Sequence, residues 1–348
     1  MKNLFITVVT LAIFNSCTND TQQNSFAETQ APQETEVETS KYISRFERIP
    51  SLSENPENIK TKAKVDLGHQ LFFDNRLSLT GNNSCNSCHN LETYGVDNLA
   101  TSIGDAGKNG GRNSPTVLNA SLHVSQFWDG RAKDVEEQAG MPILNPIEMA
   151  IPNEQFLIDK LKEIPSYVSQ FRLAFPDSEN PITYDNLKNA IGVFERELLT
   201  HSRFDSFLDG DQNALNAQEK EGFVAFNTVG CVTCHSGIAI GGSMLMKFGL
   251  FEDYVPLTKS SKVDYGKFES TGKESDKFMF KVSSLRNVEK THPYFHDGSV
   301  DKLEDAVQIM AKTQLGKTLS DKEVEDITAF LSSLTGEIPS KYKEAPKK

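Results

Sequence analysis

The chain has 348 residues, with 48 acidic and 36 basic side chains and a net charge of −12. This length is enough for two domains of ordinary size, and the negative charge argues against nucleic acid as a partner. Phenylalanine is abundant, with 22 copies, while tryptophan occurs once. We interpret most of the phenylalanines as residues that pack an apolar interior.

The N-terminus is predicted to be an export signal over residues 1–17. Lys2 precedes an apolar run over residues 4–14, which is too short to span a bilayer. No A-x-A cleavage site follows, and the sequence Phe-Asn-Ser before Cys17 is similar to a loose bacterial lipobox. We therefore expect a periplasmic protein that meets a membrane only through a lipid anchor at Cys17. The alternative is an ordinary secretion signal that is removed together with Cys17.

Composition also predicts the domain organisation. Residues 18–41 are rich in Thr, Gln, Glu, Asn and Ser and cannot bury a core, so they are expected to form a disordered tether. Folded sequence is expected from residue 42, as an N-terminal domain over 42–200 and a C-terminal domain over 201–348.

The folded part is predicted to be mainly α-helical. Apolar residues with helical spacing predict a helix over residues 184–199. Three further helices are predicted by a capping residue that is followed three positions later by glutamate: Asn216 with Glu219, Asp301 with Glu304, and Ser320 with Glu323. Gly336 is expected to stop the last of these helices, and residues 104–113 are expected to form a loop. No convincing run of alternating strands is present.

Two copies of the motif C-x-x-C-H carry the chemistry. The first comprises Cys85, Cys88 and His89, and the second comprises Cys231, Cys234 and His235. This motif attaches a c-type haem through two thiols and offers the histidine to the iron. A four-cysteine zinc site would not need the two histidines, and a thioredoxin-like βαβ context for a redox C-x-x-C is absent. The sequence therefore predicts two covalently bound c-type haems, 146 residues apart (231 minus 85).

The sixth iron ligand decides the chemistry of each haem, because methionine favours electron transfer while an open position admits peroxide. Met310 lies near the end of a predicted helix, at the place of a late ligand in a small cytochrome c domain. The alternative interpretation is that Met310 fills space in the core.

Several longer stretches resemble the bacterial di-haem cytochrome c peroxidases, over residues 65–334. The matching stretches are Leu71-Phe72-Phe73-Asp74, Arg76-Leu77-Ser78, residues 85–91, residues 112–116, Gln126-Phe127-Trp128-Asp129-Gly130-Arg131, Glu148-Met149, residues 285–288, residues 293–298 and Met310 with residues 313–316. The resemblance implies two cytochrome c-like haem domains packed face to face, with a calcium ion between them.

The resemblance also implies roles for individual residues. It makes the first haem peroxidatic, with His89 proximal, and the second an electron-entry haem with His235 and Met310 as ligands. Trp128 matches an electron-relaying tryptophan, although a lone tryptophan is usually a core residue. Glu148 matches a distal acid/base and Gln138 a nearby amide, although a glutamate in a helical protein is usually a solvated charge.

The implied calcium site uses the side chain of Asn113 and the carbonyls of Thr291 and Pro293, and oxygen ligands suit this hard cation. One departure stands out, because Asp105 occupies the position at which many relatives carry a removable distal histidine. His69, His123 and His201 are interpreted as structural or surface residues.

The resemblance implies that hydrogen peroxide is reduced to water with electrons from a small donor protein, a c-type cytochrome or a cupredoxin. Homodimers are frequent in the family. A di-haem oxidase that modifies a protein substrate is one alternative, but such enzymes carry tyrosine where this chain has Met310. A non-catalytic di-haem electron carrier is the other, and the lack of a distal histidine and the presence of Glu148 argue against it.

Overall fold

The structure is a computed structural model that describes residue 1 and residues 38–347. The export signal, Cys17 and nearly all of the predicted tether lie outside the described residues. The fold is mainly α, as predicted. After helical residues 38–43, the α-helices are α2 (Lys62–Phe72), α3 (Cys85–Cys88), α4 (Val135–Leu144), α5 (Glu154–Lys162), α6 (Pro165–Ala174), α7 (Tyr184–Glu195), α8 (Arg203–Leu208), α9 (Ala217–Val229), α10 (Tyr254–Thr258), α11 (Phe268–Thr271), α12 (Leu303–Leu315) and α13 (Asp321–Ser332).

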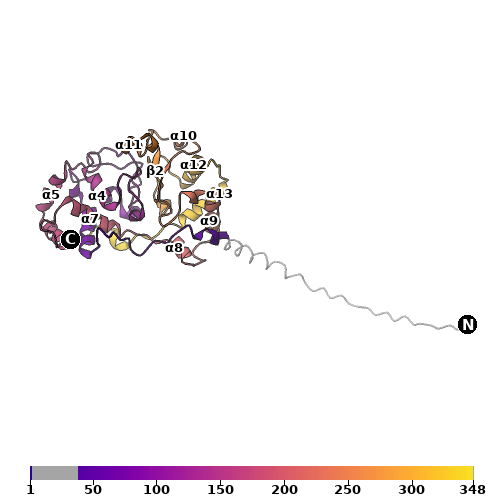
Figure 1. Cartoon of the computed structure of the whole chain (residues 1–348), viewed down its shortest axis with the longest axis horizontal. Helices are drawn as coiled ribbons and strands as arrows, with labels where there is room; N and C mark the ends of the chain where they lie inside the picture. The colour runs from indigo at the N-terminus through magenta and orange to yellow at the C-terminus, as the bar shows by residue number, and fades with distance from the viewer. Residues whose placement is uncertain (2–37, 348) are drawn as a thin grey trace.

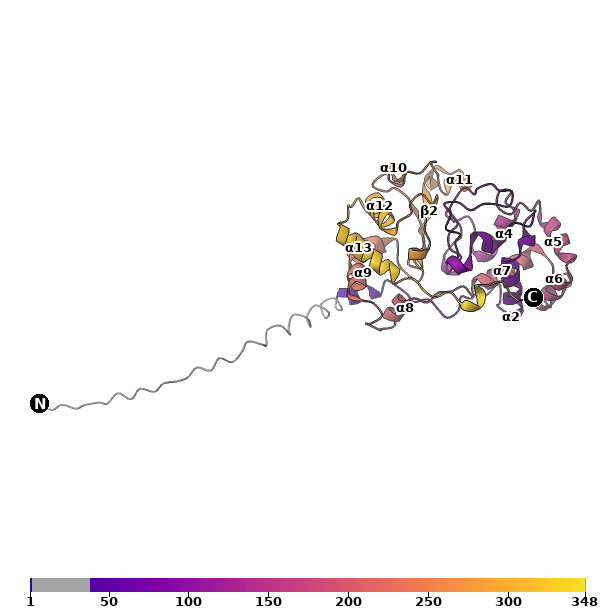
Figure 2. The ribbon, with the colours of Figure 1, turned by 180° about the vertical axis from the view of Figure 1, so that it is seen from behind.

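These helices form two lobes that face each other (Figure 1), with α2 and α4–α7 in one lobe and α9, α12 and α13 in the other. The view from behind shows the same division (Figure 2). Each lobe has its own apolar core. The first core contains Phe72, Leu187 and Phe194, and the second contains Phe223, Phe226 and Phe330.

The two lobes use the same helix crossing. In the first lobe a Cβ atom on Gly68 of α2 would lie 1.9 Å from the Ala190 carbonyl oxygen of α7. In the second lobe a Cβ atom on Gly222 of α9 would lie 1.8 Å from the Asp326 carbonyl oxygen of α13. Glycine is therefore required at both crossings, because any side chain would hold the two helices apart.

Both ends of the described chain cross to the opposite lobe. Phe46 packs in the core of the C-terminal half, and Ile338 and Tyr342 pack in the core of the N-terminal half. The N-terminal segment is also fixed by the Ile49 N–H, which donates to Asp205 Oδ1 at 2.8 Å. The segment that holds Phe46 therefore packs with the C-terminal lobe, although the predicted boundaries assign it to the N-terminal domain. The segment that holds Ile338 and Tyr342 packs with the N-terminal lobe, although it is assigned to the C-terminal domain.

The sequence signals for helix starts and ends differ in how accurately they predict the observed helices. The predicted capping boxes at the starts of α9 and α13 are present. The Asp301 prediction is wrong, because α12 begins at Leu303 with Lys302 as an N-cap that makes no side-chain hydrogen bond. Helix α13 ends at Ser332, before Gly336, and α7 ends at Glu195 rather than at residue 199.

A small sheet was not predicted. Strands β1 (Leu245–Lys247) and β2 (Met279–Lys281) pair antiparallel, with Leu245 opposite Lys281. Strands of three residues are too short to show the alternation that marks a strand in sequence. In the described part of the chain, no helix is long and apolar enough to cross a membrane.

Candidate functional site

The first C-x-x-C-H motif forms a single helical turn at the wall of a large cavity. Ser84 is the N-cap of α3, and its side chain and that of Ser87 form a reciprocal capping box. Cys85, Cys88 and His89 then line a cavity of about 680 Å³. Burial lowers the pKa of the His89 imidazole, which therefore stays in the neutral form that ligates iron. The two half-buried thiols and the neutral imidazole on one wall fit a covalently attached haem.

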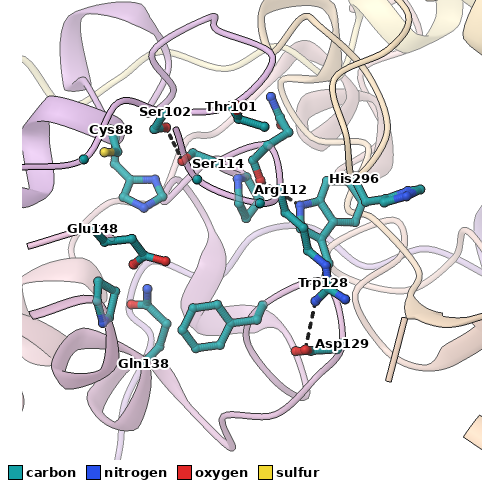
Figure 3. Close-up of a pocket in the computed structure, with 18 of the residues that line it drawn as sticks. Cys88, Thr101, Ser102, Arg112, Ser114, Trp128, Asp129, Gln138, Glu148 and His296 are labelled. Carbon is teal, nitrogen blue, oxygen red and sulfur yellow. Dashed lines mark hydrogen bonds and ion pairs between the residues drawn. The ribbon is translucent and has the colours of Figure 1, made fainter. Parts of the chain in front are cut away.

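Glu148 and Gln138 face the same cavity from another segment. Gln138 lies on α4, and Glu148 follows the end of this helix. Figure 3 shows the two side chains next to each other, both directed into the space below Cys88. Asn145 Nδ2 donates to Glu148 Oε1 at 2.8 Å. Burial raises the pKa of the Glu148 carboxyl, and the charge of Arg131 opposes this shift only in part. Glu148 can therefore exchange a proton at a higher pH than an exposed glutamate.

The second C-x-x-C-H motif follows α9 in a 3-10 turn over Cys231–Thr233. His235 Nδ1 donates to the Ser283 carbonyl oxygen at 3.1 Å, which leaves Nε2 for a metal. Burial lowers the pKa of the His235 imidazole to about 4, so this ring is also neutral. Cys231, Cys234 and His235 line a second cavity of about 190 Å³, and this arrangement also fits a covalently attached haem.

The second cavity is mostly apolar and contains methionine sulfur. Met310 of α12 and Met246 of β1 both line it. Met310 also packs against a small cluster made of Phe248, Tyr254 and Phe280. Two methionines therefore line this cavity together with His235, and only Met310 was singled out from the sequence.

Trp128 and His296 each line both cavities. Trp128 Nε1 donates to the Asn113 carbonyl oxygen at 2.8 Å. The two rings meet edge to face, with centroids 6.3 Å apart. His296 is 2% exposed, and no described residue bonds its Nε2. These aromatic side chains form the partition between the two cavities.

The residues of the implied calcium site come from segments that lie together. The Asn113 N–H donates to the His296 carbonyl oxygen at 2.7 Å, next to the segment that holds Thr291 and Pro293. Asn113 Nδ2 donates to the Leu99 carbonyl oxygen at 2.9 Å, and no described residue donates to its Oδ1. Within the described residues, no group of three or more His, Cys, Asp or Glu side chains could hold a metal. A cation here would therefore depend on amide and carbonyl oxygens.

The remaining singled-out residues lie away from the first cavity. The Asp105 carboxylate does not line it and accepts hydrogen bonds from Thr80 and Asn82 instead. His123 lines neither cavity, and its Nδ1 lies 3.3 Å from Lys281 Nζ. His69 is buried, with Nε2 2.9 Å from the Glu344 carbonyl oxygen, and His201 is exposed.

Sequence reasoning missed two polar features of the first cavity. Arg112 bonds Asp129 at 2.8 Å and Asp264 at 2.7 Å, and so links the two lobes beside Trp128. Arg112 and Asp129 stand in recognisable motifs, but nothing in the sequence pairs them with Asp264. Glu195 also lines this cavity, and burial raises the pKa of its carboxyl to about 8. A glutamate at the end of an amphipathic helix gives no sign of such burial.

Two haem-attachment turns, each with a half-buried neutral histidine, define a di-haem c-type cytochrome in a mainly α fold. Comparisons with known proteins narrow this class. The family model of di-haem cytochrome c peroxidase matches residues 62–213. The chain is 47% identical to cytochrome c551 peroxidase of Nitrosomonas europaea, over 83% of this chain and 84% of the relative. It is 48% identical to cytochrome c551 peroxidase of Pseudomonas aeruginosa, over 79% of each chain.

The fold agrees with these matches. A solved MauG-like protein associated with microbial copper homeostasis superposes with a TM-score of 0.75, at 28% identity, over 86% of this chain and 97% of that chain. The protein thus belongs to the di-haem cytochrome c peroxidase family.

Proposed function

We propose that this protein reduces hydrogen peroxide to water with electrons from a small redox protein. The observation that carries this proposal is Glu148, a carboxyl with a raised pKa that faces the same cavity as the haem-attachment residues. The reaction consumes one peroxide, two electrons and two protons and yields two water molecules. The cavity must therefore supply protons as well as electrons.

Cys85, Cys88 and His89 would hold the first haem, and Cys231, Cys234, His235 and Met310 would hold the second. When bound, the haems supply the redox chemistry that cleaves the O–O bond and stores electrons. Glu148 takes a proton from one oxygen of peroxide and returns it to the leaving oxygen, which departs as water. Gln138 donates an N–H to the peroxide and so helps to orient it beside the carboxylate.

Trp128 is proposed as the side chain through which electrons pass from the second cavity to the first. Its support is its position in the partition between the cavities. A c-type cytochrome or a cupredoxin is the proposed donor, because methionine ligation by Met310 would keep the second haem at a potential that such donors can reduce.

The calcium ion is proposed to bind Asn113 Oδ1 and the carbonyl oxygens of Thr291 and Pro293, with water completing the shell. We further propose a periplasmic location, a lipid anchor at Cys17 and a homodimer. The location follows from covalent haem attachment, which takes place outside the cytoplasm.

Steady-state peroxide turnover with candidate donors tests the proposed function. It should be measured from fully oxidised and from half-reduced protein. Turnover with at least one c-type cytochrome or cupredoxin is expected, together with a visible spectrum that contains one high-spin and one low-spin ferric haem. Peroxide consumption no faster than with free haem would refute the proposal.

The protein-modifying oxidase is the second candidate. The chain shares 28% identity with the MauG-like structure and 47% with a named peroxidase, so the comparisons support the peroxidase more strongly. The presence of Met310 in the second cavity disfavours the oxidase, because the resemblance places tyrosine there in such oxidases. A near-infrared sulfur–iron band distinguishes the two, since only methionine ligation produces it.

A further inference from the structure

Three segments meet beside the first cavity and are joined in a ring of hydrogen bonds. The Leu79 N–H donates to the Met149 carbonyl oxygen at 2.9 Å, and the Asp105 N–H donates to the Glu148 carbonyl oxygen at 2.7 Å. The Asp105 carboxylate closes the ring by accepting from the segment that begins at Leu79. Asp105 therefore binds both neighbouring segments of this ring, the one that begins at Leu79 and the one that contains Glu148.

The carboxylate of Asp105 accepts three hydrogen bonds from residues 80–82. It accepts from Thr80 N–H at 2.7 Å, Thr80 Oγ1 at 2.9 Å and Asn82 N–H at 3.1 Å. The residue is 4% exposed. Burial by itself would raise the pKa of this carboxyl, but the hydrogen bonds from Thr80 and Asn82 outweigh it and lower the pKa. Asp105 is thus an ionised acceptor aimed at residues 78–82 and away from the cavity.

The backbone at Asp105 is pressed against the Glu148 segment. A Cβ atom on the preceding Gly104 would lie 1.7 Å from the Ile147 carbonyl oxygen, so only glycine allows this approach. On the other side, residues 78–82 lead directly into Ser84, the N-cap of the haem-attachment helix α3. The ring therefore connects the backbone that carries the first haem to the backbone that carries Glu148.

The loop that contains Asp105 is held by internal main-chain bonds, such as Gly104 N–H to the Lys108 carbonyl oxygen at 2.8 Å, and by bonds to neighbouring segments. Residues 104–111 include four glycines, which lose much conformational entropy when they are ordered. Gly110 N–H donates to the Ser102 carbonyl oxygen at 2.8 Å, and Asn83 Nδ2 donates to the Ile103 carbonyl oxygen at 2.8 Å. The three bonds to the Asp105 carboxylate join the start of this loop to residues 80–82.

We propose that Asp105 is a positioning residue that clamps Glu148 at a set distance from the first haem-attachment helix. It acts through the backbone of Glu148 and does not touch peroxide or haem. This inference rests on the proposed function of Glu148. It also predicts that the loop stays docked in both redox states, because the clamp uses only groups of the protein.

The test compares Asp105→Ala and Asp105→Asn with wild type in the haem-loaded protein. Alanine removes all three bonds, and asparagine sets an N–H₂ group against the donors of Thr80 or Asn82. We expect kcat to fall at least about tenfold in Asp105→Ala, within the roughly 10²-fold loss that a misplacement of about 1 Å can cause. The KM for peroxide should change less than kcat. Asp253→Asn is the matched control, since Asp253 also accepts a main-chain N–H, from Val255, but lies outside both cavities.

A double-variant cycle distinguishes positioning from a general structural role. If Asp105 acts through Glu148, Asp105→Ala should cause almost no further loss of kcat in a Glu148→Gln background. An equal loss in both backgrounds would overturn the proposal. Thr80→Val, which removes one of the three bonds, gives a milder variant if Asp105→Ala does not fold, and the same cycle applies to it.

Hydrogen–deuterium exchange tests the clamp without reference to activity. The amides of Thr80, Asn82 and Asp105 should exchange faster in the Asp105 variants, while those of α9 should not change. Unchanged exchange at Thr80 and Asn82 would overturn the clamp. If wild type lacks peroxidase activity, the proposed function fails, whereas the exchange data still decide whether the clamp exists.

Discussion

The two haem cavities share an attachment motif and differ in nearly everything around it. In the first cavity, Gln138 and Glu148 stand opposite the motif, and charged side chains such as Arg112 complete the wall. In the second cavity, Met310 and a largely apolar lining surround it. We propose that the same C-x-x-C-H sequence serves a proton-consuming site in one lobe and an electron-entry site in the other. The proposed difference is the proton carrier Glu148 in the first cavity and the soft sulfur ligand Met310 in the second.

The largest effect is expected for Glu148→Gln. Glutamine keeps the shape of the side chain but cannot carry the proton, so turnover should fall by about two to four orders of magnitude. Glu137→Gln is a matched control, because Glu137 is exposed on α4 and lines neither cavity. Near-wild-type turnover of Glu148→Gln with both haems loaded would exclude Glu148 as the acid/base.

The pH profile sharpens this assignment. Burial raises the pKa of Glu148 above its ordinary 4.5, and the ionised form is the one that accepts the peroxide proton. The kcat/KM for peroxide should therefore fall as the pH drops through this raised pKa, and the acid limb should vanish in Glu148→Gln. An acid limb that survives the substitution would assign it to another group.

Met310→His should lower the reduction potential of the second haem. A nitrogen ligand stabilises ferric iron more than a thioether does, so the potential of the second haem should fall by on the order of 0.2 V, within the ~0.8 V range that axial ligands span. Met246→Leu is the informative control, because Met246 lines the same cavity. Loss of the near-infrared sulfur–iron band in Met246→Leu, with the band retained in the Met310 variant, would reverse the assignment.

The shared helix crossing predicts similar losses of stability in both lobes. Gly68→Ala and Gly222→Ala each force a methyl group into a carbonyl oxygen of the partner helix. Each should lower the free energy of unfolding by roughly 1–3 kcal/mol, the scale of an overpacked core. Gly111→Ala is the control, since a Cβ atom there meets no atom within 4 Å. Calorimetry that finds either variant as stable as this control would show that its helices can separate freely.

Removing a proposed calcium ligand should have a smaller effect that reaches both cavities. Asn113→Ala should weaken calcium binding by about 10- to 100-fold and reduce turnover when calcium is limiting. Asn109→Ala on the same loop is the control. Metal analysis of active protein checks the site, and its failure to detect calcium would exclude it. If chelation removes calcium and activity persists, the ion does not couple the lobes.

The smallest effect is expected from reduction of the second haem, which should leave the ligation and spin state of the first haem unchanged. The Asp105 carboxylate is bound to Thr80 and Asn82, and His123 lies against Lys281, so neither side chain lines the first cavity. The oxidised protein should already show a high-spin signal by electron paramagnetic resonance, and peroxide should bind without prior reduction. Two low-spin haems, one of them with two histidine ligands, would show that a substitute ligand is present.

Short-range signals made much of the chemistry predictable. The C-x-x-C-H motifs are local, because one turn of backbone places both thiols and the histidine. Capping boxes at Asn216 and Ser320 are local for the same reason, and they are present in the structure. The resemblance supplied Glu148, Gln138 and Trp128, which the structure brings to the walls of the first cavity, although their roles remain predictions.

Long-range contacts were not predictable in the same way. Nothing near Asp105 in the sequence shows that its carboxylate binds Thr80 while its N–H binds Glu148, since these partners are 25 residues before it and 43 residues after it (105 minus 80, and 148 minus 105). The packing of Phe46 and Tyr342 in the opposite lobes could not be predicted either, because an apolar residue can pack equally well in either core. The sequence by itself determined which groups attach haem and which helices form, through interactions within a few residues. Only the tertiary structure decided which groups share a cavity, because burial and hydrogen bonding between distant segments set their distances and their pKa values.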